Sequence, residues 1–109
     1  MLPGEVRYAN VMGGDLKPKW RYVLVLSRPI AGSKNVFLLA FSSKIQNARP
    51  DDVVISDPAE LLQAGLTVPS YVSTNFVFTM PAGELSILKG TLTPATFKFV
   101  SSTFISHIG

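Results

Sequence analysis

A group of basic residues around the single tryptophan is the first feature of this sequence that could do chemistry. Lys17, Lys19 and Arg21 flank Trp20, and Gly13-Gly14 lies just before them. Lysine and arginine can neutralise phosphates, and an indole ring can stack on an unpaired base, so this segment could hold single-stranded nucleic acid. The alternative is a solvated hairpin loop in which Trp20 folds back onto the core. Residue types alone leave both interpretations open.

A second polar group follows an apolar stretch later in the chain. Ser42, Ser43 and Lys44 come directly after the run Val36–Phe41. Hydroxyls and a lysine at a strand end could bind a phosphate, although serines there more often satisfy backbone groups. The only histidine, His107, lies near the C-terminus. We interpret it as a cation at a helix end rather than as a catalyst.

Residue counts exclude several other kinds of site. The chain has no cysteine, which excludes a disulfide framework, a thiolate metal site and a cysteine nucleophile. Asp51-Asp52 follow Pro50 and predict a turn rather than a pair of catalytic carboxylates. The sequence contains neither a P-loop nor a dinucleotide-binding fingerprint. We therefore expect no metal and no cofactor.

Size and composition indicate one domain, residues 1–109, that hides apolar surface against another chain. Charged residues make up 16% of the sequence and hydrophobic residues 47%, against about 25% charged in ordinary globular chains. So few charged residues leave much of the surface of a small domain apolar. We therefore expect this apolar surface to contact a partner such as a second copy of the chain. No apolar run approaches the roughly 18 residues needed to cross a bilayer, and no secretory pattern opens the chain. We expect a soluble, intracellular protein.

The net charge of +3 is unevenly distributed along the chain. Residues 1–49 have a balance of +6, and residues 50–109 have a balance of −3. A basic first half points to a polyanionic partner. If strands from both halves mix within one domain, however, the asymmetry averages out.

Eight prolines divide the chain into short elements, most of them strand-like. Short strands separated by turn signals are typical of a small barrel or sandwich. The expected strands are Glu5–Val11, Tyr22–Ser27, Val36–Ser42, Val53–Ile55, a region with Tyr71-Val72 and Phe76–Phe78, and Ser86–Leu88.

Two helices are expected among these strands. For the first, Asp57 can cap, Pro58 takes the first helical position, Glu60 completes a capping box and Gly65 ends the helix. The second begins after Thr93, the expected cap, and runs to the C-terminus. Its predicted apolar stripe consists of Phe97, Val100, Phe104 and Ile108.

Six short motifs follow one another in a recognisable order over nearly the whole chain. They are Gly4–Val6, Arg21–Ser27, Ser42–Ile45, Ala64–Val72, Phe76–Met80 and Gly90–Thr93. Their order and spacing resemble the PemK/MazF family of toxin endoribonucleases from type II toxin–antitoxin systems. No single motif is highly specific, but the six in sequence are.

The resemblance implies a mainly β fold, an SH3-like small barrel with a short mid-chain helix and a C-terminal helix, assembled as a homodimer. It also implies a growth inhibitor of the bacterial cytoplasm that cleaves single-stranded RNA, mostly mRNA, and that a cognate antitoxin neutralises. In the implied reaction, the 2′-hydroxyl attacks the neighbouring phosphorus and leaves a cyclic phosphate and a 5′-hydroxyl. This chemistry requires no metal.

The resemblance also assigns roles to individual residues. Arg21 corresponds by position to the family's catalytic arginine, and Ser42 corresponds to its catalytic threonine or serine. The two lysines nearest to them, Lys19 and Lys44, are expected to contact phosphate by proximity more than by motif. The full set of expected RNA-binding residues is Lys17, Lys19, Trp20, Ser43 and Lys44.

Two departures from the family pattern keep alternatives open. In the family a proline follows the catalytic arginine, whereas here Tyr22 follows Arg21. Some members also have an arginine or an acid in the strand that matches Ser73–Phe78, whereas these residues carry no charge here. A general base from that strand is therefore excluded, and an inactive module that binds RNA or a partner on the same fold stays possible. A CcdB-like gyrase poison is less favoured, because that branch needs a Trp-Gly-hydrophobic tail and this chain ends in Ser106–Gly109.

Overall fold

The fold is built on one curled, antiparallel sheet. The structure, a computed structural model, describes residues 2–12, 18–85 and 87–108. In the sheet the strand order is β4-β5-β3-β2-β1-β6, and every recorded pairing is antiparallel. Its strands are β1 (Glu5–Met12), β2 (Pro18–Val25), β3 (Asn35–Ser42), β4 (Val53–Ile55), β5 (Ser70–Pro81) and β6 (Leu88–Thr91).

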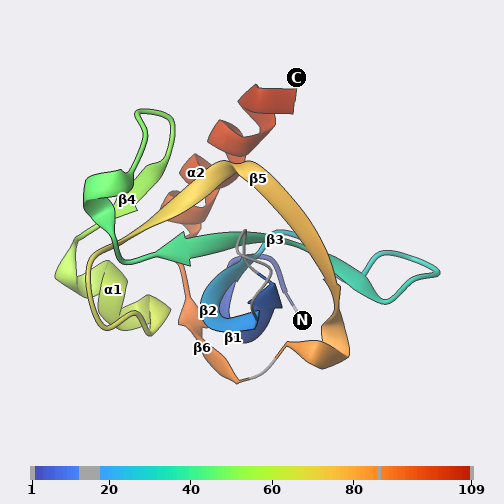
Figure 1. The fold of residues 1–109 in the computed structure, drawn as a ribbon. Coiled ribbons are helices and arrows are strands. Elements are labelled where there is room, and N and C mark those ends of the chain that lie inside the picture. Colours follow the sequence, from blue (N-terminus) through green and yellow to red (C-terminus); the bar gives the residue numbers. More distant parts are fainter. Residues whose placement is uncertain (1, 13–17, 86, 109) are drawn as a thin grey trace.

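Two α-helices accompany the sheet, α1 (Pro58–Ala64) and α2 (Pro94–Ile108). Two single 3-10 turns, η1 (Ile45–Asn47) and η2 (Ala82–Glu84), lie in connections. Figure 1 shows β5 arching over the sheet and α2 passing beside it toward the C-terminus. The predicted mainly β barrel-like fold with a mid-chain and a C-terminal helix is confirmed. The sheet is a half-barrel, because in the described residues its edge strands, β4 and β6, do not pair with each other.

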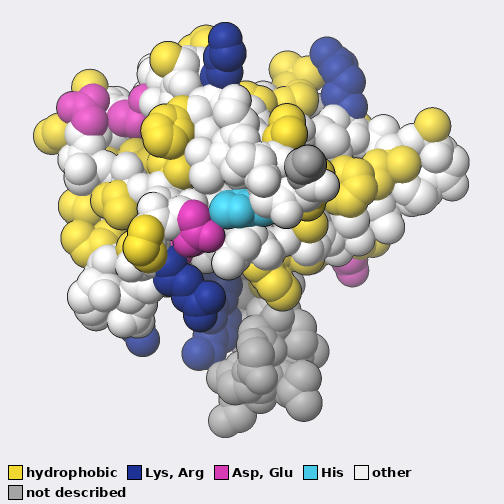
Figure 2. All heavy atoms as spheres, turned by 90° about the horizontal axis from the view of Figure 1, so that it is seen from above, with side chains coloured by type: hydrophobic (Ala, Val, Ile, Leu, Met, Phe, Trp, Pro, Cys, Tyr) yellow, Lys and Arg dark blue, Asp and Glu magenta, His cyan; other side chains and the backbone are white. Residues whose placement is uncertain are grey.

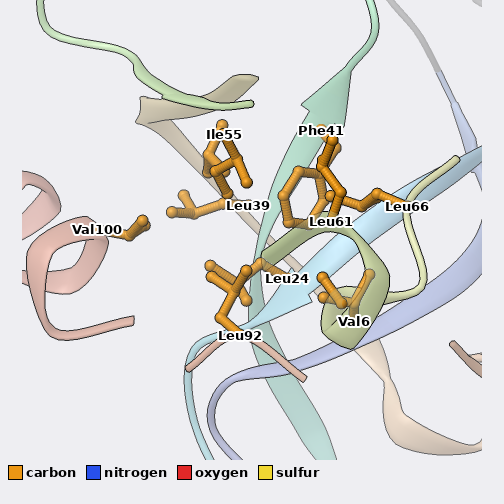
Figure 3. Close-up of a cluster of buried hydrophobic side chains, with 11 residues drawn as sticks. Val6, Leu24, Leu39, Phe41, Ile55, Leu61, Leu66, Leu92 and Val100 are labelled. Carbon is orange, nitrogen blue, oxygen red and sulfur yellow. The ribbon is translucent and has the colours of Figure 1, made fainter. Parts of the chain in front are cut away.

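Buried side chains form two clusters, one on each face of the sheet. In β2, Leu24 faces the larger cluster, whereas Val23 and Val25 face the smaller one. Burial on both faces explains why β2 reads as a continuous apolar run rather than as an alternating one. Leu61 of α1 and Val100 of α2 close the larger cluster, which Figure 3 shows in close-up.

The bounds of two predicted strands, the second and the last, differ most from the structure. The expected strand at Ser86–Leu88 is present with other bounds. β6 covers Leu88–Thr91, so only Leu88 is shared, and Ser86 itself lies outside the described residues. β6 contains Gly90, where a Cβ atom would lie 2.2 Å from the Gln63 carbonyl oxygen. Close approach to α1 therefore decides where this strand lies, rather than apolar residues. The second strand starts four residues earlier than predicted, at Pro18, because its pairing with β1 continues that far, and it ends at Val25 rather than at Ser27.

The ends of α1 follow the predicted signals, with one exception. Asp57 Oδ2 accepts a hydrogen bond from the Glu60 backbone at 3.3 Å, and Gly65 adopts the left-handed conformation with φ +73°. The expected return bond from Glu60 to the cap is wrong. The Glu60 carboxylate instead accepts hydrogen bonds from the Thr93 backbone at 2.8 Å and from the Thr93 and Thr96 hydroxyls, both at 2.7 Å. Glu60 thus joins the start of α1 to the start of α2.

The predicted stripe of α2 is buried only in part. Thr93 caps the helix as expected, since its hydroxyl accepts a hydrogen bond from the Thr96 backbone at 3.4 Å. Val100 is fully buried, and Phe97 and Phe104 pack against the larger cluster. The prediction that Ile108 belongs to the buried stripe is wrong, because this residue is 71% exposed. Ile108 is the last residue of α2, at the C-terminal end of the helix (Figure 1).

Candidate functional site

The main pocket lies where β2 and β3 separate. These strands pair only through Val23–Val25 and Leu38–Ala40. Beyond that point β2 stays paired with β1 as far as Pro18, and β3 stays paired with β5 as far as Ser42. The gap between them opens into a pocket of about 490 Å³, which the segment after α1 closes on another side. Divergence of two strands from one pairing therefore creates the site.

Six of the seven predicted site residues line this pocket. The seventh, Lys17, lies outside the described residues. The six are Lys19, Trp20, Arg21, Ser42, Ser43 and Lys44. The structure thus brings together two groups that the sequence analysis identified separately.

The other residues that line the pocket are not among those predicted from the sequence. Tyr8 and Tyr22 are direct partners across β1 and β2, so a correct strand register would have placed them together. Four residues of the segment that follows α1 belong to the Ala64–Val72 motif, which was used only for the family resemblance. The missed residues are Tyr8, Tyr22, Phe41, Leu66, Thr67, Val68 and Ser70.

The pocket is electrically positive. Lys19, Arg21 and Lys44 line it, and no described lining residue is acidic. The Arg21 guanidinium forms no ion pair with any described residue, whereas Arg7 outside the pocket binds Glu5 at 2.9 Å. Because arginine presents several N–H donors in a planar fork, Arg21 can grip two oxygens of an anion. The pocket suits a phosphate group.

Ser42 has a hydroxyl proton to donate. Its Oγ accepts a hydrogen bond from the Lys44 backbone at 3.3 Å, which uses a lone pair and not the proton. Among the described residues, no acceptor takes that proton. The expectation that such serines satisfy strand-end backbone groups is thus correct for Ser42, and it leaves the hydroxyl able to donate to a ligand oxygen.

Trp20 lies on the surface of the site rather than in the core. Its side chain is 53% exposed. Its ring stacks on Tyr8 with 5.4 Å between centroids and 23° between planes. The interpretation in which Trp20 folds back onto the core is therefore wrong. An aromatic surface lies beside three cations and a free hydroxyl.

A smaller pocket of about 260 Å³ contains the buried carboxylate of Glu60. Burial alone would raise the pKa of Glu60, but hydrogen bonds from the Thr93 backbone and from the Thr93 and Thr96 hydroxyls outweigh it, and the pKa is lowered. A carboxylate held in its charged form by three donors is a structural link between helices and not a proton donor.

A Thr–His–Asp group also lies outside the main pocket. Thr74 Oγ1 donates to the Asp51 carbonyl oxygen at 2.8 Å, so the contact with His107 Nε2 at 3.0 Å requires the histidine to donate. Asp51 Oδ2 lies 3.7 Å from that same nitrogen, and not beside the other ring nitrogen as in a catalytic triad. His107 thus fastens the last turn of α2 to β5.

Metal-ligating side chains are scattered in the part of the chain that the structure describes. No three of them are grouped so that they could hold a metal ion there. Within the same residues, no helix is both long enough and apolar enough to cross a membrane.

Comparison with known proteins identifies relatives of this fold. An endoribonuclease in complex with its cognate antitoxin, from a mycobacterial species, shares 21% identity and a TM-score of 0.73, covering 100% of this chain and 93% of that one. A Mycobacterium tuberculosis MazF toxin shares 23% identity and a TM-score of 0.64, covering 96% and 92%. A MazE–MazF structure from Deinococcus radiodurans shares 18% identity and a TM-score of 0.71, covering 100% and 95%.

A family model extends this likeness from fold to sequence. A search of curated protein sequences finds no match. The model for the PemK-like, MazF-like toxins of type II toxin–antitoxin systems, however, matches residues 2–108. Together with the half-barrel fold, this match confirms the resemblance drawn from the six motifs. The chain belongs to the PemK/MazF-like family of type II toxins.

Proposed function

We propose that this chain is a metal-independent endoribonuclease toxin that cleaves single-stranded RNA. The observation that carries the proposal is the pocket between β2 and β3, where Arg21 and Ser42 lie together with Lys19 and Lys44. A positive, acid-free pocket with a hydroxyl donor matches the needs of phosphodiester cleavage. Membership of the toxin family, together with solved relatives described as endoribonucleases, supports the same activity.

The proposed reaction uses the RNA's own 2′-hydroxyl as nucleophile. This oxygen forms a bond to phosphorus and loses its proton, while the bond from phosphorus to the 5′-oxygen breaks and that oxygen takes up a proton. The products are a 2′,3′-cyclic phosphate and a 5′-hydroxyl. The difficulty lies in the extra negative charge on the phosphoryl oxygens of the transition state, which preorganised donors stabilise.

The pocket residues divide this work. The Arg21 fork holds a non-bridging phosphate oxygen, and the Ser42 hydroxyl donates to the same phosphate. Lys19 and Lys44, with Ser43 and Lys17, hold the phosphates on either side, and Trp20 contacts a base. DNA lacks the nucleophilic 2′-hydroxyl, so it would bind this pocket without being cut.

A non-cutting RNA-binding module is the second candidate function. The uncharged stretch Ser73–Phe78 of β5 favours it, because no side chain of that stretch can serve as a charged general acid or base. Such a module would keep the positive pocket and the aromatic surface, and would bind RNA without forming products.

The proposed molecule is one domain, residues 1–109, that acts as a homodimer in the bacterial cytoplasm and is neutralised by an antitoxin. Solved relatives include an endoribonuclease with its cognate antitoxin and a MazE–MazF structure. Large apolar side chains are exposed on β5 and α2, and Figure 2 shows hydrophobic groups scattered over the face that carries the histidine. Partner chains would cover such side chains. Those most exposed on these two elements are Phe76, Phe99, Ile105 and Ile108.

Incubation of the purified protein with single-stranded RNA in EDTA tests the activity. We expect cleavage products with cyclic phosphate and 5′-hydroxyl ends. Arg21→Ala and Ser42→Ala should lose cleavage while staying folded, and Lys98→Ala on the exposed side of α2 should keep it. Full activity in both pocket variants would overturn the assignment, and RNA binding without products would favour the non-cutting module.

A further inference from the structure

We propose that Tyr8, Trp20 and Tyr22 form an aromatic wall that binds one RNA base beside the cleaved phosphate and favours a purine there. This inference rests on the proposed function, because the phosphate held by Arg21 defines which base lies next to the wall. It adds a determinant of substrate choice that comes from this chain's own rings.

The three rings are placed by the pairing of β1 and β2. Tyr8 pairs with Tyr22, and Asn10 pairs with Trp20, so all three aromatic side chains lie on one face of this hairpin. Tyr8 stacks with Trp20 and lies 5.0 Å from the Tyr22 ring at an interplanar angle of 50°. Tyr8 is therefore the ring that lies against both of the others.

The outer ring has room for a further stacking partner. Trp20 stacks on Tyr8 with one face, yet its side chain is 53% exposed. Strand pairing and the Tyr8 ring already hold the indole. A base that stacks on the exposed part of the indole therefore costs little in ordering the side chain. Lys89 Nζ lies 5.4 Å from the centre of the Tyr8 ring and adds a positive charge to this wall.

The wall lies next to the phosphate-binding groups. Trp20 and Arg21 are consecutive residues of β2, about 3.8 Å apart at their Cα atoms, and strand alternation directs them to opposite sides. Both line the pocket because it lies at the edge where β2 leaves β3. A phosphate at Arg21 and a base at Trp20 can thus belong to neighbouring groups of one RNA strand.

Stacking on this wall distinguishes bases by the size of their ring system and not by the hydrogen-bonding groups on their edges. Base–aromatic stacking needs only a flat face and tolerates any base, and a two-ring purine overlaps a two-ring indole more fully than a pyrimidine does. On the neighbouring wall, the Ser70 hydroxyl already donates to the Val68 carbonyl oxygen at 3.0 Å, so its proton does not read a base edge. The wall therefore separates purines from pyrimidines, and not adenine from guanine.

The fluorescence of Trp20 tests this directly, because it is the only tryptophan of the chain. The probes are 2′-O-methyl RNA hexamers, which cannot be cleaved, with one position at a time changed to purine, pyrimidine or abasic. At one position we expect strong quenching with a purine and weak quenching with a pyrimidine. Removing that base should lower affinity about 5- to 150-fold. If purine, pyrimidine and abasic probes quench the fluorescence equally at every position, the proposed aromatic wall is wrong.

Variants provide the second measurement. Trp20→Ala should bind the purine and abasic probes equally, and Trp20→Phe should restore part of the difference. Phe37→Ala, an exposed aromatic residue on β3 outside the pocket, should behave as wild type. A purine preference that survives in Trp20→Ala would overturn the proposal, and should that variant not fold, the wild-type quenching decides.

A parallel assay with unmodified RNA separates the two proposals. Cleavage of RNA without any base-dependent quenching overturns the wall and leaves the endoribonuclease activity standing. Purine-dependent quenching without cleavage supports the wall and overturns the activity, in favour of the non-cutting module.

Discussion

Arg21 and Ser42 have the chemical properties that the proposed cleavage requires, and their neighbours explain why. Arg21 forms no ion pair with any described residue, and all the charged residues that line the pocket with it are cations. Ser42 keeps its proton because the Lys44 backbone bonds only to its oxygen. Both groups are thus ready to interact with phosphoryl oxygens without first breaking a contact inside the protein.

Replacement of Arg21 by lysine separates charge from geometry. Arg21→Lys keeps the positive charge but loses the planar fork, so RNA binding should change little. Cleavage should fall by about 100-fold, the order expected when one preorganised donor is lost. Single-turnover cleavage and binding of a 2′-O-methyl RNA measure the two effects. Cleavage at the wild-type rate in this variant would show that the fork is not needed.

Among the elements, α1 shapes the pocket although only the chain beyond it lines the site. Gly65 ends the helix in the left-handed conformation, and a Cβ atom there would lie 2.1 Å from the Lys89 carbonyl oxygen. That turn sends the chain directly into Leu66–Val68, which forms one pocket wall. At the other end of the helix, Glu60 binds the start of α2. Packing of α1 is therefore coupled to the shape of the site.

The hydrogen bonds between Glu60 and the start of α2 make the free energy of unfolding depend on pH. Because folding lowers the pKa of Glu60 below its ordinary value of 4.5, its contribution is complete above about pH 4.5 and disappears as pH falls through the lowered value. Glu60→Gln should destabilise the protein at pH 7 by about 1–3 kcal/mol, because an amide cannot accept all three hydrogen bonds. The free energy of unfolding of Glu60→Gln should also fall less steeply than that of the wild type as the pH is lowered.

Urea unfolding of wild type and Glu60→Gln between pH 3 and pH 7 measures this difference. Glu84→Gln, at an exposed acid of η2, is the matched control and should follow the wild type. If the curves of wild type and Glu60→Gln run parallel over the whole range, the carboxylate does not carry the link.

At the scale of the whole molecule, topology keeps the basic half of the chain together. The strands β3, β2 and β1 are neighbours in the middle of the sheet, and the later strands flank them at both edges. The asymmetry between a first half of +6 and a second half of −3 is therefore not averaged out by mixing of strands. The positive side gathers Lys19, Arg21 and Lys44 at one pocket.

Binding of RNA should therefore weaken with salt in proportion to the phosphates held. Three phosphate contacts to a single strand predict a slope of about −2 for log K against log salt, and Lys44→Ala should reduce its magnitude by about 0.7. Lys98→Ala, on α2 and away from the pocket, should leave the slope unchanged. Fluorescence anisotropy of a labelled 2′-O-methyl RNA over a salt series measures this. Equal slopes for wild type and Lys44→Ala would exclude Lys44 as a phosphate contact.

Local signals in the sequence determined most elements of this fold. Asp57, Gly65 and Thr93 mark helix ends because capping depends on a few neighbouring residues and their backbone angles. The motif order also predicted the family and named Arg21 and Ser42, which the structure places at one pocket. The predicted bounds failed at β6, where close packing of Gly90 against α1 overrides the apolar pattern.

Only the tertiary structure decided which groups meet. Trp20 and Arg21 line one pocket with Ser42 because β2 and β3 stop pairing at one point, and Tyr8 joins them through the register of β1 with β2. Glu60 binds Thr93, 33 residues away, rather than its own helix cap. Such contacts depend on strand order, on register and on where pairing ends. These are properties of the packed chain, and no local pattern of residues encodes them.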